Sequence, residues 1–420
     1  MHPQPPAPEA ASIPRATIAF GATVATGAFL LFLVEPLMAK YILPWYGGTP
    51  AVWTTCMLFY QTFVLLGYAY AHGLSRWCPV RFQPIVHLAL LGVALFLLPV
   101  TPSEAWRPAS GASPVWSILL MLSACLGLPF ALLAATSPLL QRWYAMVVPG
   151  AVPYRYFALS NAASFLALLA YPFLVEPLLS RGAQAVIWSW GMGVYVLLCG
   201  TAAVITLRLA NRTAGPETPA PTASTPPSAL WLGLPMAASV LLLAVTNKLC
   251  QEIAVVPFLW VCPLLLYLLS FVVAFDRPRW YSRPLFGGMF AAAVLIVAWL
   301  PFRPGDPPIG LSLVAHCALL FAACMLCHGE LYRMRPAPER LTGYYLTIAG
   351  AGALGGVFVV LVAPALFSDY AELPIGVGVC GGLVASVWYR EPRGFLAGGR
   401  RRWAWGLLGV FLLGRFISMK

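Results

Sequence analysis

Long apolar segments separated by short polar ones dominate the chain. A helix that crosses a membrane needs about 20 consecutive apolar residues, and twelve segments approach this length. They cover residues 16–39, 51–74, 83–101, 114–140, 155–179, 183–207, 229–248, 256–275, 284–301, 309–332, 341–367 and 373–389. Their apolar positions are continuous and do not alternate with polar ones, as the strands of a membrane barrel would. The pattern predicts an all-α integral membrane protein with about twelve transmembrane helices.

Composition and charge support a membrane protein and exclude a nucleic-acid binder. Hydrophobic residues make up 60% of the chain and charged residues 9%, whereas a soluble domain carries about 25% charged residues. A net charge of +12 would suit nucleic acid only if it were gathered on one soluble face. Here the basic residues are spread over the ends of the apolar segments. We therefore expect the lipid bilayer, and no nucleic acid, as the partner of this surface.

The distribution of Lys and Arg predicts the orientation of the chain. If the N-terminus is cytoplasmic, eighteen basic residues lie in the tail and loops on the cytoplasmic side, and five lie in the opposite loops. Loops rich in Lys and Arg stay in the cytoplasm. The sequence thus predicts a multi-pass membrane protein with its N-terminus in the cytoplasm.

One polar segment divides the predicted helices six and six. It reads NRTAGPETPAPTASTPPS, and its Pro, Thr and Ser content predicts disorder. The expected organisation is a cytoplasmic tail (1–15), a six-helix bundle (16–210), a disordered cytoplasmic linker (211–228), a second six-helix bundle (229–389) and a basic tail (390–420). The apolar stretch 403–419 in that tail is either a thirteenth span or a helix lying in the membrane interface.

The two halves also share sequence features. HGLSRW follows the second apolar segment and FDRPRW follows the eighth. In the fifth segment RYFALSNAASF leads to FLVEP, and in the eleventh GYYLTIAGAGA leads to VLVAP. Two six-helix halves repeated in parallel are the layout of major facilitator transporters.

Four longer stretches resemble a known family. They are EPLMAKYILPWYGGTPAVWTTCMLFYQ, LSNAASFLALLAYPFLVEP, TNKLCQEIAVVPFLWVCPLLLYLLSFVVAFD and CHGELYRMRPAPERLTGYYL. They are similar to the membrane portion of bacterial fused major-facilitator/spermidine-synthase proteins, over about residues 25–370. After Arg390 no residue matches a synthase site, so the resemblance implies the membrane portion alone. It implies transport of a small solute, polyamine-like or another organic compound, and a soluble synthase-like protein as a partner. Because the fused proteins are bacterial, it also implies a bacterial inner membrane.

A nine-residue motif occurs twice and supplies the first candidate residues. FLVEPLMAK ends the first apolar segment and FLVEPLLSR ends the fifth. Glu35 and Glu176 then lie near the C-termini of helices, where the helix dipole disfavours an acid. The hypothesis we favour pairs Glu35 with Lys40 and Glu176 with Arg181, so that the two motifs form matching posts of a gate. The alternative is that the acids bind substrate or a proton.

The other candidates are polar residues within or near apolar segments, where such groups commonly line a pathway. His328 and Glu330 lie near the cytoplasmic end of the tenth segment and are candidates for a second gate or a proton site, because His titrates near neutral pH. Lys248 and Glu252 lie at the outer end of the seventh segment and are further candidates for the charged gate. For Gln61, Asn161 and Asn247 the interpretation we favour is hydrogen bonding between helices, and lining of a pathway is the alternative.

Two short motifs suggest cofactor chemistry but lie in the wrong context. CMLCH has the spacing of a haem-attachment motif, yet it falls inside an apolar helix on the predicted cytoplasmic side. GAGALG matches a dinucleotide fingerprint in letters only, because no strand precedes it. We predict no cofactor, no metal and no catalytic site, and hence a protein that is not an enzyme. The preferred function is a secondary transporter of a small solute, with organic cations among the candidates. The alternative is a membrane scaffold for a separately encoded spermidine-synthase-like or methyltransferase-like enzyme.

Overall fold

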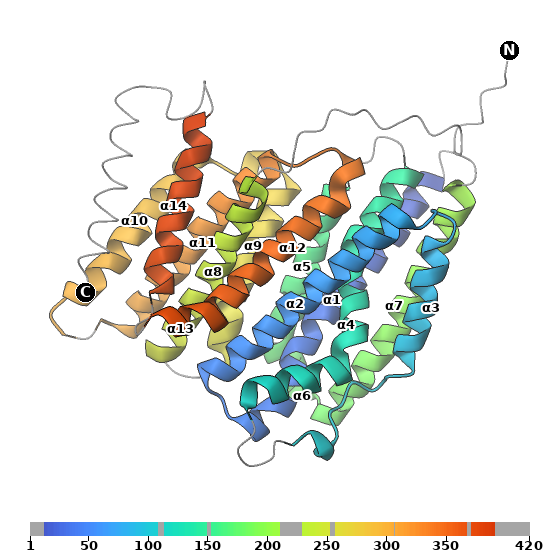
Figure 1. Cartoon of the computed structure of the whole chain (residues 1–420), viewed down its shortest axis with the longest axis horizontal. Helices are drawn as coiled ribbons and strands as arrows, with labels where there is room; N and C mark the ends of the chain where they lie inside the picture. The colour runs from blue at the N-terminus through green and yellow to red at the C-terminus, as the bar shows by residue number, and fades with distance from the viewer. Residues whose placement is uncertain are drawn as a thin grey trace. The chain divides into compact units, whose positions relative to one another are not determined.

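The computed structural model describes residues 12–390, except 108–112, 149–152, 211–228, 253–256, 306 and 368–370. Within these residues every regular element is helical (Figure 1). The predicted linker and the apolar stretch 403–419 lie outside the described residues. The expectations about their disorder and membrane placement therefore stay predictions.

Each of the twelve predicted spans corresponds to one helix or to one run of consecutive helical segments. In chain order they are α1 (Ser12–Tyr46), α2 (Pro50–Trp77), α3 (Gln83–Leu95), α4 (Pro114–Val147), α5 (Tyr154–Ala170) with η2 (Tyr171–Val175) and α6 (Glu176–Leu178), α7 (Arg181–Ala210), α8 (Ala229–Glu252), α9 (Pro257–Asp276), α10 (Arg283–Trp299), α11 (Ile309–Arg333), α12 (Leu341–Val357) with η6 (Phe358–Val362) and α13 (Ala363–Leu366), and α14 (Glu372–Arg390). Short 3₁₀ turns lie between them: η1 (Glu104–Trp106), η3 (Pro278–Trp280), η4 (Leu300–Phe302) and η5 (Pro338–Arg340). Ten helical segments of the described chain are long and apolar enough to span a membrane.

The third predicted span is shorter than expected. It was predicted over 83–101, but α3 ends at Leu95. Pro99 lacks a backbone N–H and disfavours helical geometry in the residue before it, so an apolar run can continue after its helix has ended. The 13 residues of α3 rise by about 20 Å, less than the roughly 30 Å of a hydrocarbon core.

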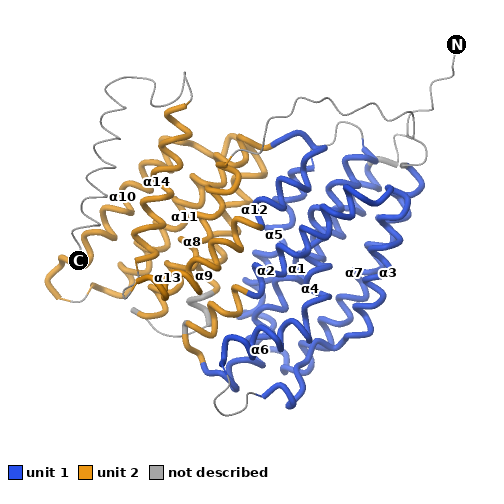
Figure 2. The backbone as a smooth tube through the Cα atoms, in the orientation of Figure 1, with its two compact units in different colours: residues 1–47, 59–226, 336–349 blue, residues 48–58, 227–335, 350–420 orange. Residues whose placement is uncertain are grey.

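The chain divides into two compact units (Figure 2). Unit 1 comprises residues 1–47, 59–226 and 336–349, and unit 2 comprises 48–58, 227–335 and 350–420. The first turns of α2 thus belong to unit 2, and the first half of α12 belongs to unit 1. The six-and-six domain division remains a prediction, from which the units differ in these two short segments.

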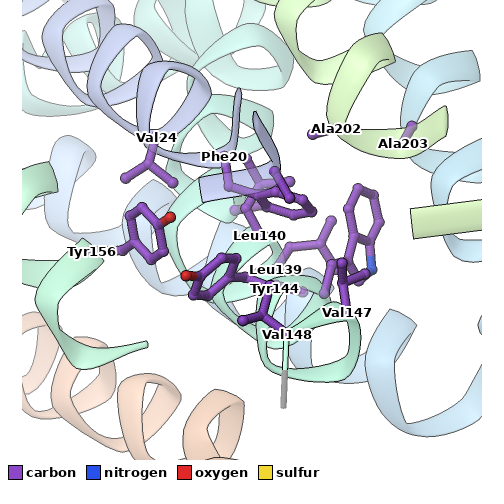
Figure 3. Packing of buried hydrophobic residues seen from close by; sticks show 14 of the residues in the cluster. Phe20, Val24, Leu139, Leu140, Tyr144, Val147, Val148, Tyr156, Ala202 and Ala203 are labelled. Atoms are coloured by element: carbon purple, nitrogen blue, oxygen red, sulfur yellow. The ribbon is translucent and has the colours of Figure 1, made fainter. Parts of the chain in front are cut away.

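The core of unit 1 contains large aromatic side chains from three helices (Figure 3). The rings of Phe20 on α1 and Tyr144 on α4 lie 5.6 Å apart, and Tyr144 meets Tyr156 of α5 edge-on at 4.7 Å. Trp143 is fully buried in the same cluster. Such aromatic pairs contribute about 0.5–1.5 kcal/mol each beyond the area that they bury, and they fix α1, α4 and α5 against one another.

Unit 2 is organised around α8 and α11. Helix α8 packs against α9, α11 and α14, and α11 also packs against α10. The hydroxyl of Ser239 on α8 donates to the carbonyl oxygen of Gly352 on α12 at 3.0 Å. This hydrogen bond satisfies a buried polar group that would otherwise be costly in an apolar interior.

The sequence pairing of FLVEP with VLVAP is matched by the local backbone. The π-helical turns η2 and η6 each precede an X–Pro pair. The N–H of Glu176 donates to the carbonyl of Tyr171, and the N–H of Ala363 donates to that of Phe358. Both runs end one residue after their short final helix, α6 or α13, in an extended residue. The fifth and eleventh spans therefore repeat one structure, with an acid in unit 1 where unit 2 has alanine.

Candidate functional site

The two copies of the nine-residue motif meet in unit 1, but their charges pair differently from our prediction. Lys40 Nζ lies 3.2 Å from Glu176 Oε1, so the base of the first motif binds the acid of the second. The predicted pairs Glu35–Lys40 and Glu176–Arg181 are not formed among the described residues. Residues five apart on a helix point about 140° away from each other, whereas α1 packs directly against α5. Each base therefore meets a neighbouring helix rather than its own acid.

The basic residues of both motifs lie over aromatic rings. Lys40 Nζ lies 5.8 Å from the ring centre of Tyr171, and the guanidinium of Arg181 lies 4.4 Å from that of Tyr41. The hydroxyl of Tyr171 donates to Gln184 Oε1 at 3.0 Å. The side chains of Lys40 and Glu176 remain 27% and 48% exposed. Solvent therefore screens the pair, and it can open at low cost.

Glu35 has a different environment, although its sequence context is the same. It is 4% exposed, and its Oε2 atom is buried with no hydrogen-bond partner. The hydroxyl of Tyr60 reaches only the backbone carbonyl of Glu35, at 3.3 Å. Within the described residues Glu35 forms no ion pair. A buried ionised carboxylate without a counter-charge is expensive, and this carboxyl group can gain or lose a proton without breaking an ion pair.

The second polar cluster lies in unit 2 and is centred on Glu330. Arg283 binds both carboxylate oxygens, Nε to Oε1 and Nη2 to Oε2, each at 2.6 Å. Oε1 also accepts from Tyr281 at 2.7 Å and from Trp388 Nε1 at 2.9 Å. We call Glu330, Arg283, Tyr281 and Trp388 the Glu330 cluster. Burial and then the charge of Glu330 raise the pKa of the Tyr281 phenol, so that it remains a donor.

Local sequence explains how the Glu330 cluster forms. Arg283 is the first residue of α10 and is followed by Pro284, which suits the first turn of a helix. A Cβ atom on Gly329 would lie 2.4 Å from the Tyr281 ring, so glycine allows that ring to lie against α11. The cluster is fully hydrogen-bonded, which indicates a structural joint rather than an open binding site. Sequence reasoning found Glu330 but missed Arg283, whose place directly before a proline at the start of an apolar segment was the available signal.

His328 is close to Glu330 in sequence but has separate contacts. The Ser270 hydroxyl donates its one hydrogen to the Tyr267 carbonyl at 2.6 Å, so at 2.8 Å His328 Nδ1 must be the donor to Ser270 Oγ. The ring stacks on Phe271 with centroids 3.6 Å apart. Nε2 is then a buried acceptor without a hydrogen-bond partner. This geometry fits a neutral imidazole with a fixed tautomer.

The remaining candidates are not brought together with either cluster by any contact that the structure describes. Asn161 Nδ2 donates to the Phe157 carbonyl within α5 at 2.8 Å. Gln61 is half-buried on α2, and Asn247 and Lys248 are half-buried near the end of α8. Glu252 is the last residue of α8, and its side chain lies outside the described part. Among the described residues no group of three or more potential ligands is arranged to hold a metal ion.

A buried amide that the sequence did not single out links residues 336–349 to the rest of unit 1. Gln141 Oε1 accepts from the Tyr345 hydroxyl at 3.0 Å, and Gln141 Nε2 donates to Ser137 Oγ at 2.9 Å. His72 Nδ1 and Thr342 Oγ1 are also hydrogen-bonded, at 3.0 Å. The first half of α12 thus packs in unit 1 through specific polar contacts as well as apolar ones.

Comparison with known proteins assigns the fold. No known protein-family model and no curated protein sequence matches the chain. A solved structure of a proton:xylose symporter of the major facilitator superfamily matches 96% of this chain and 95% of its own, with a TM-score of 0.52 and 14% identity. An auto-inhibited peptide transporter of the POT family matches 96% of each chain with a TM-score of 0.49 and 12% identity. The chain has the major facilitator fold.

This finding confirms the predicted fold class. The all-helical architecture, with about twelve helices, is that of the major facilitator superfamily. The ten long apolar helices among the described residues make it a multi-pass membrane protein. At 14% identity the likeness establishes the fold, and the function must be argued from the residues themselves.

Proposed function

We propose that the protein is a secondary transporter that moves a small organic solute by alternating access and couples this movement to a proton at Glu35. The observation that carries the proposal is the buried Glu35 carboxyl group, whose Oε2 atom has no hydrogen-bond partner. Ionisable residues within membrane spans commonly mark ion or substrate pathways. The solved proton:xylose symporter has the same fold, which is consistent with proton-coupled transport in this chain.

The contrast with Glu176 supports the choice of Glu35. Both acids follow the residues FLV and precede proline. Glu176 has a basic partner at 3.2 Å and is half-exposed, whereas Glu35 is buried without one. Proton release from Glu35 would create an uncompensated charge, and a cationic group or a conformational change that admits water would stabilise that charge. Proton exchange at Glu35 is thereby linked to solute binding or to opening.

In this proposal the Lys40–Glu176 ion pair breaks and re-forms during transport, and we call it the latch. It joins the end of α1 to the short helix α6, directly after the π-helical turn η2. Turns of this kind often occur at functional sites. Because the pair is partly exposed, opening it costs little, and it can re-form in each transport cycle. This part of the proposal replaces the predicted gate, in which each acid bound the base of its own motif.

The solute class and orientation are proposed from the sequence. The charge bias favours an N-terminus in the cytoplasm, and the resemblance to bacterial fused proteins favours an inner membrane. The resemblance to fused spermidine-synthase proteins makes polyamines and other organic cations the first compounds to test. After proton release, the ionised Glu35 could gain its counter-charge from such a cation. The soluble synthase-like partner is a prediction from the same resemblance.

A ligand panel followed by flux measurements tests the transporter proposal. Purified protein is screened by thermal shift against polyamines, other organic cations, sugars and short peptides. Compounds that raise the melting temperature are then tested in liposomes that carry a pH-sensitive dye inside. We expect uptake of the active compound to be accompanied by proton movement. Uptake without any dye response would reject proton coupling but leave transport standing.

Two matched variants test the role of Glu35. Glu35→Gln should keep the ligand-induced thermal shift and exchange of labelled for unlabelled solute, but lose accumulation driven by a pH gradient. Glu176→Gln changes the same side chain in the same motif; loss of the latch can alter its uptake rate, but accumulation should still depend on the pH gradient. A second readout needs no solute: an infrared band of a protonated carboxyl group should be absent in Glu35→Gln and present in Glu176→Gln. Unchanged accumulation in Glu35→Gln would rule out Glu35 as the coupling site.

A further inference from the structure

Two pairs of cysteine thiols lie close together in unit 2. Cys262 Sγ on α9 is 4.0 Å from Cys317 Sγ on α11. Cys327 Sγ on α11 is 3.5 Å from Cys380 Sγ on α14. All four thiols are free in the structure. A disulfide needs a sulfur–sulfur distance of about 2.05 Å, so the two sulfur atoms of either pair would have to approach by about 1.5–2 Å to bond.

The two pairs differ in burial and in the position along α11 of the cysteine that each pair has on that helix. Cys262 and Cys317 are half-buried, whereas Cys327 and Cys380 are buried. Cys317 lies in the first part of α11 and Cys327 in the last part. Ten residues of helix separate these two positions, which corresponds to about 15 Å, or half of a hydrocarbon core. A redox partner outside the membrane could reach one pair more readily than the other.

The charge pattern places the pairs toward opposite compartments. Helix α9 ends just before Arg277 and α11 ends at Arg333, in loops that the Lys and Arg bias predicts to be cytoplasmic. The Cys262–Cys317 pair, near the beginnings of both helices, then lies toward the extracytoplasmic side. Disulfides form and persist in that oxidising compartment and are rare in the cytoplasm.

We infer that Cys262 and Cys317 form a disulfide in the mature protein, whereas Cys327 and Cys380 stay reduced. In this reaction the thiolate of one cysteine attacks the disulfide of an extracytoplasmic thiol oxidoreductase, and the second cysteine then displaces that enzyme. A sulfur–sulfur bond forms between Cys262 and Cys317. Two electrons and two protons pass to the oxidoreductase, which leaves as a dithiol.

The crosslink would join α9 to α11 across 55 positions of sequence. Helix α10 lies between them in the chain and is already tied to α11 through Arg283 and Glu330. The disulfide on one side of the membrane and the Glu330 cluster near the other end of α11 would hold α9, α10 and α11 as one rigid block. This inference goes beyond the transport proposal and does not depend on transport, but it rests on the proposed orientation of the chain.

Counting free thiols by mass tests the inference. Membranes that contain the full chain are denatured in excess N-ethylmaleimide without reductant, and the intact mass gives the number of adducts. The chain has 10 cysteines. We expect eight adducts before reduction and ten after reduction and a second alkylation. Ten adducts before reduction would overturn the inference.

Serine variants identify which pair is oxidised. Cys262→Ser leaves nine cysteines and no partner for Cys317, so we expect nine adducts. Cys327→Ser also leaves nine cysteines but keeps the disulfide, so we expect seven. The reverse result, seven adducts for Cys262→Ser and nine for Cys327→Ser, would assign the disulfide to Cys327 and Cys380 and reject the inference. Reduction should also lower the melting temperature of the parent protein but not that of Cys262→Ser.

Discussion

The third predicted span of each half, α3 in unit 1 and α10 in unit 2, begins with a buried polar residue, but the two units provide different partners for it. In unit 1, Gln83 is the first residue of α3 and precedes a proline; its Oε1 atom accepts from Trp143 Nε1 on α4 at 2.9 Å. In unit 2, Arg283 is the first residue of α10, also precedes a proline, and binds Glu330 on α11 at 2.6 Å. We call these two contacts, Gln83–Trp143 and Arg283–Glu330, the joints of the two units. The side chains of both joints are buried. The first joint is neutral and the second is an ion pair.

This difference separates what the fold requires from what it permits. Each helix begins with a buried polar side chain, and such a group must be hydrogen-bonded. Gln83 meets this need with two bonds, the second from its Nε2 atom to the Cys78 carbonyl at 2.8 Å. The charged joint adds two more donors, Tyr281 and Trp388, to the carboxylate. The fold therefore requires a satisfied partner at this position but no charge, and the charged joint must be more sensitive to the loss of one member.

The largest effect is expected for Glu330→Gln. This change keeps the size of the side chain but leaves the Arg283 guanidinium buried without a counter-charge. Breaking a buried ion pair on one side costs about 3–5 kcal/mol. Thermal unfolding in detergent should show a large drop in melting temperature, whereas Glu104→Gln, at an exposed position, should show almost none.

A double variant shows whether charge or shape matters in that joint. Combining Arg283→Gln with Glu330→Gln makes the joint neutral, as in unit 1. The pair should be more stable than Glu330→Gln alone, because no uncompensated charge remains. If the double variant were the less stable of the two, the two joints would not be interchangeable.

A somewhat smaller effect is expected for Gly329→Ala. The added Cβ atom would lie 2.4 Å from Cδ2 of Tyr281, so the ring must move away from α11. Overpacking of this kind costs about 1–3 kcal/mol, and displacement of Tyr281 would weaken a charge-assisted bond to Glu330 as well. Gly310→Ala on the same helix meets no atom within 4 Å and should not lower the melting temperature.

The neutral joint should be the more tolerant one. Gln83→Leu leaves Trp143 Nε1 and the Cys78 carbonyl without their partner. Unsatisfied buried groups of this kind cost about 1–3 kcal/mol. The melting temperature should fall less than for Glu330→Gln, and Gln251→Leu, at an exposed position, serves as the control. A larger fall for Gln83→Leu than for Glu330→Gln would contradict the ranking of the two joints.

The helices could be predicted from sequence because length and apolarity alone decide whether a segment can span a membrane. Within the described residues each of the twelve predicted segments contains a helix. The error at the end of α3 arose because an apolar run can continue past its helix. The repeat was also readable, since FLVEP and VLVAP share one backbone geometry. These features depend on residues that are neighbours in sequence.

Side-chain partners could not be predicted in the same way. Whether Lys40 binds Glu35 or Glu176 depends on which helix faces it, and that follows from packing over the whole unit. Arg283 lies 47 positions from Glu330, and no local pattern reports such a distance. The outcome was that one acid of the repeated motif is paired and the other is buried alone, although their sequence contexts are the same.

The smallest effect is expected at the Lys40–Glu176 pair, which is an ion pair like Arg283–Glu330 but is more exposed to solvent. Unlike Arg283 and Glu330, these two side chains are 27% and 48% exposed. Exposed ion pairs contribute about 0.2–1 kcal/mol. In a double-mutant cycle, Lys40→Met, Glu176→Gln and their combination should give a coupling energy within that range, and added salt should reduce it further. The Arg283–Glu330 cycle should keep most of its coupling at high salt, because burial limits screening. Equal couplings in the two cycles would mean that burial does not set the strength of these pairs, and the low opening cost assigned to the latch would then be wrong.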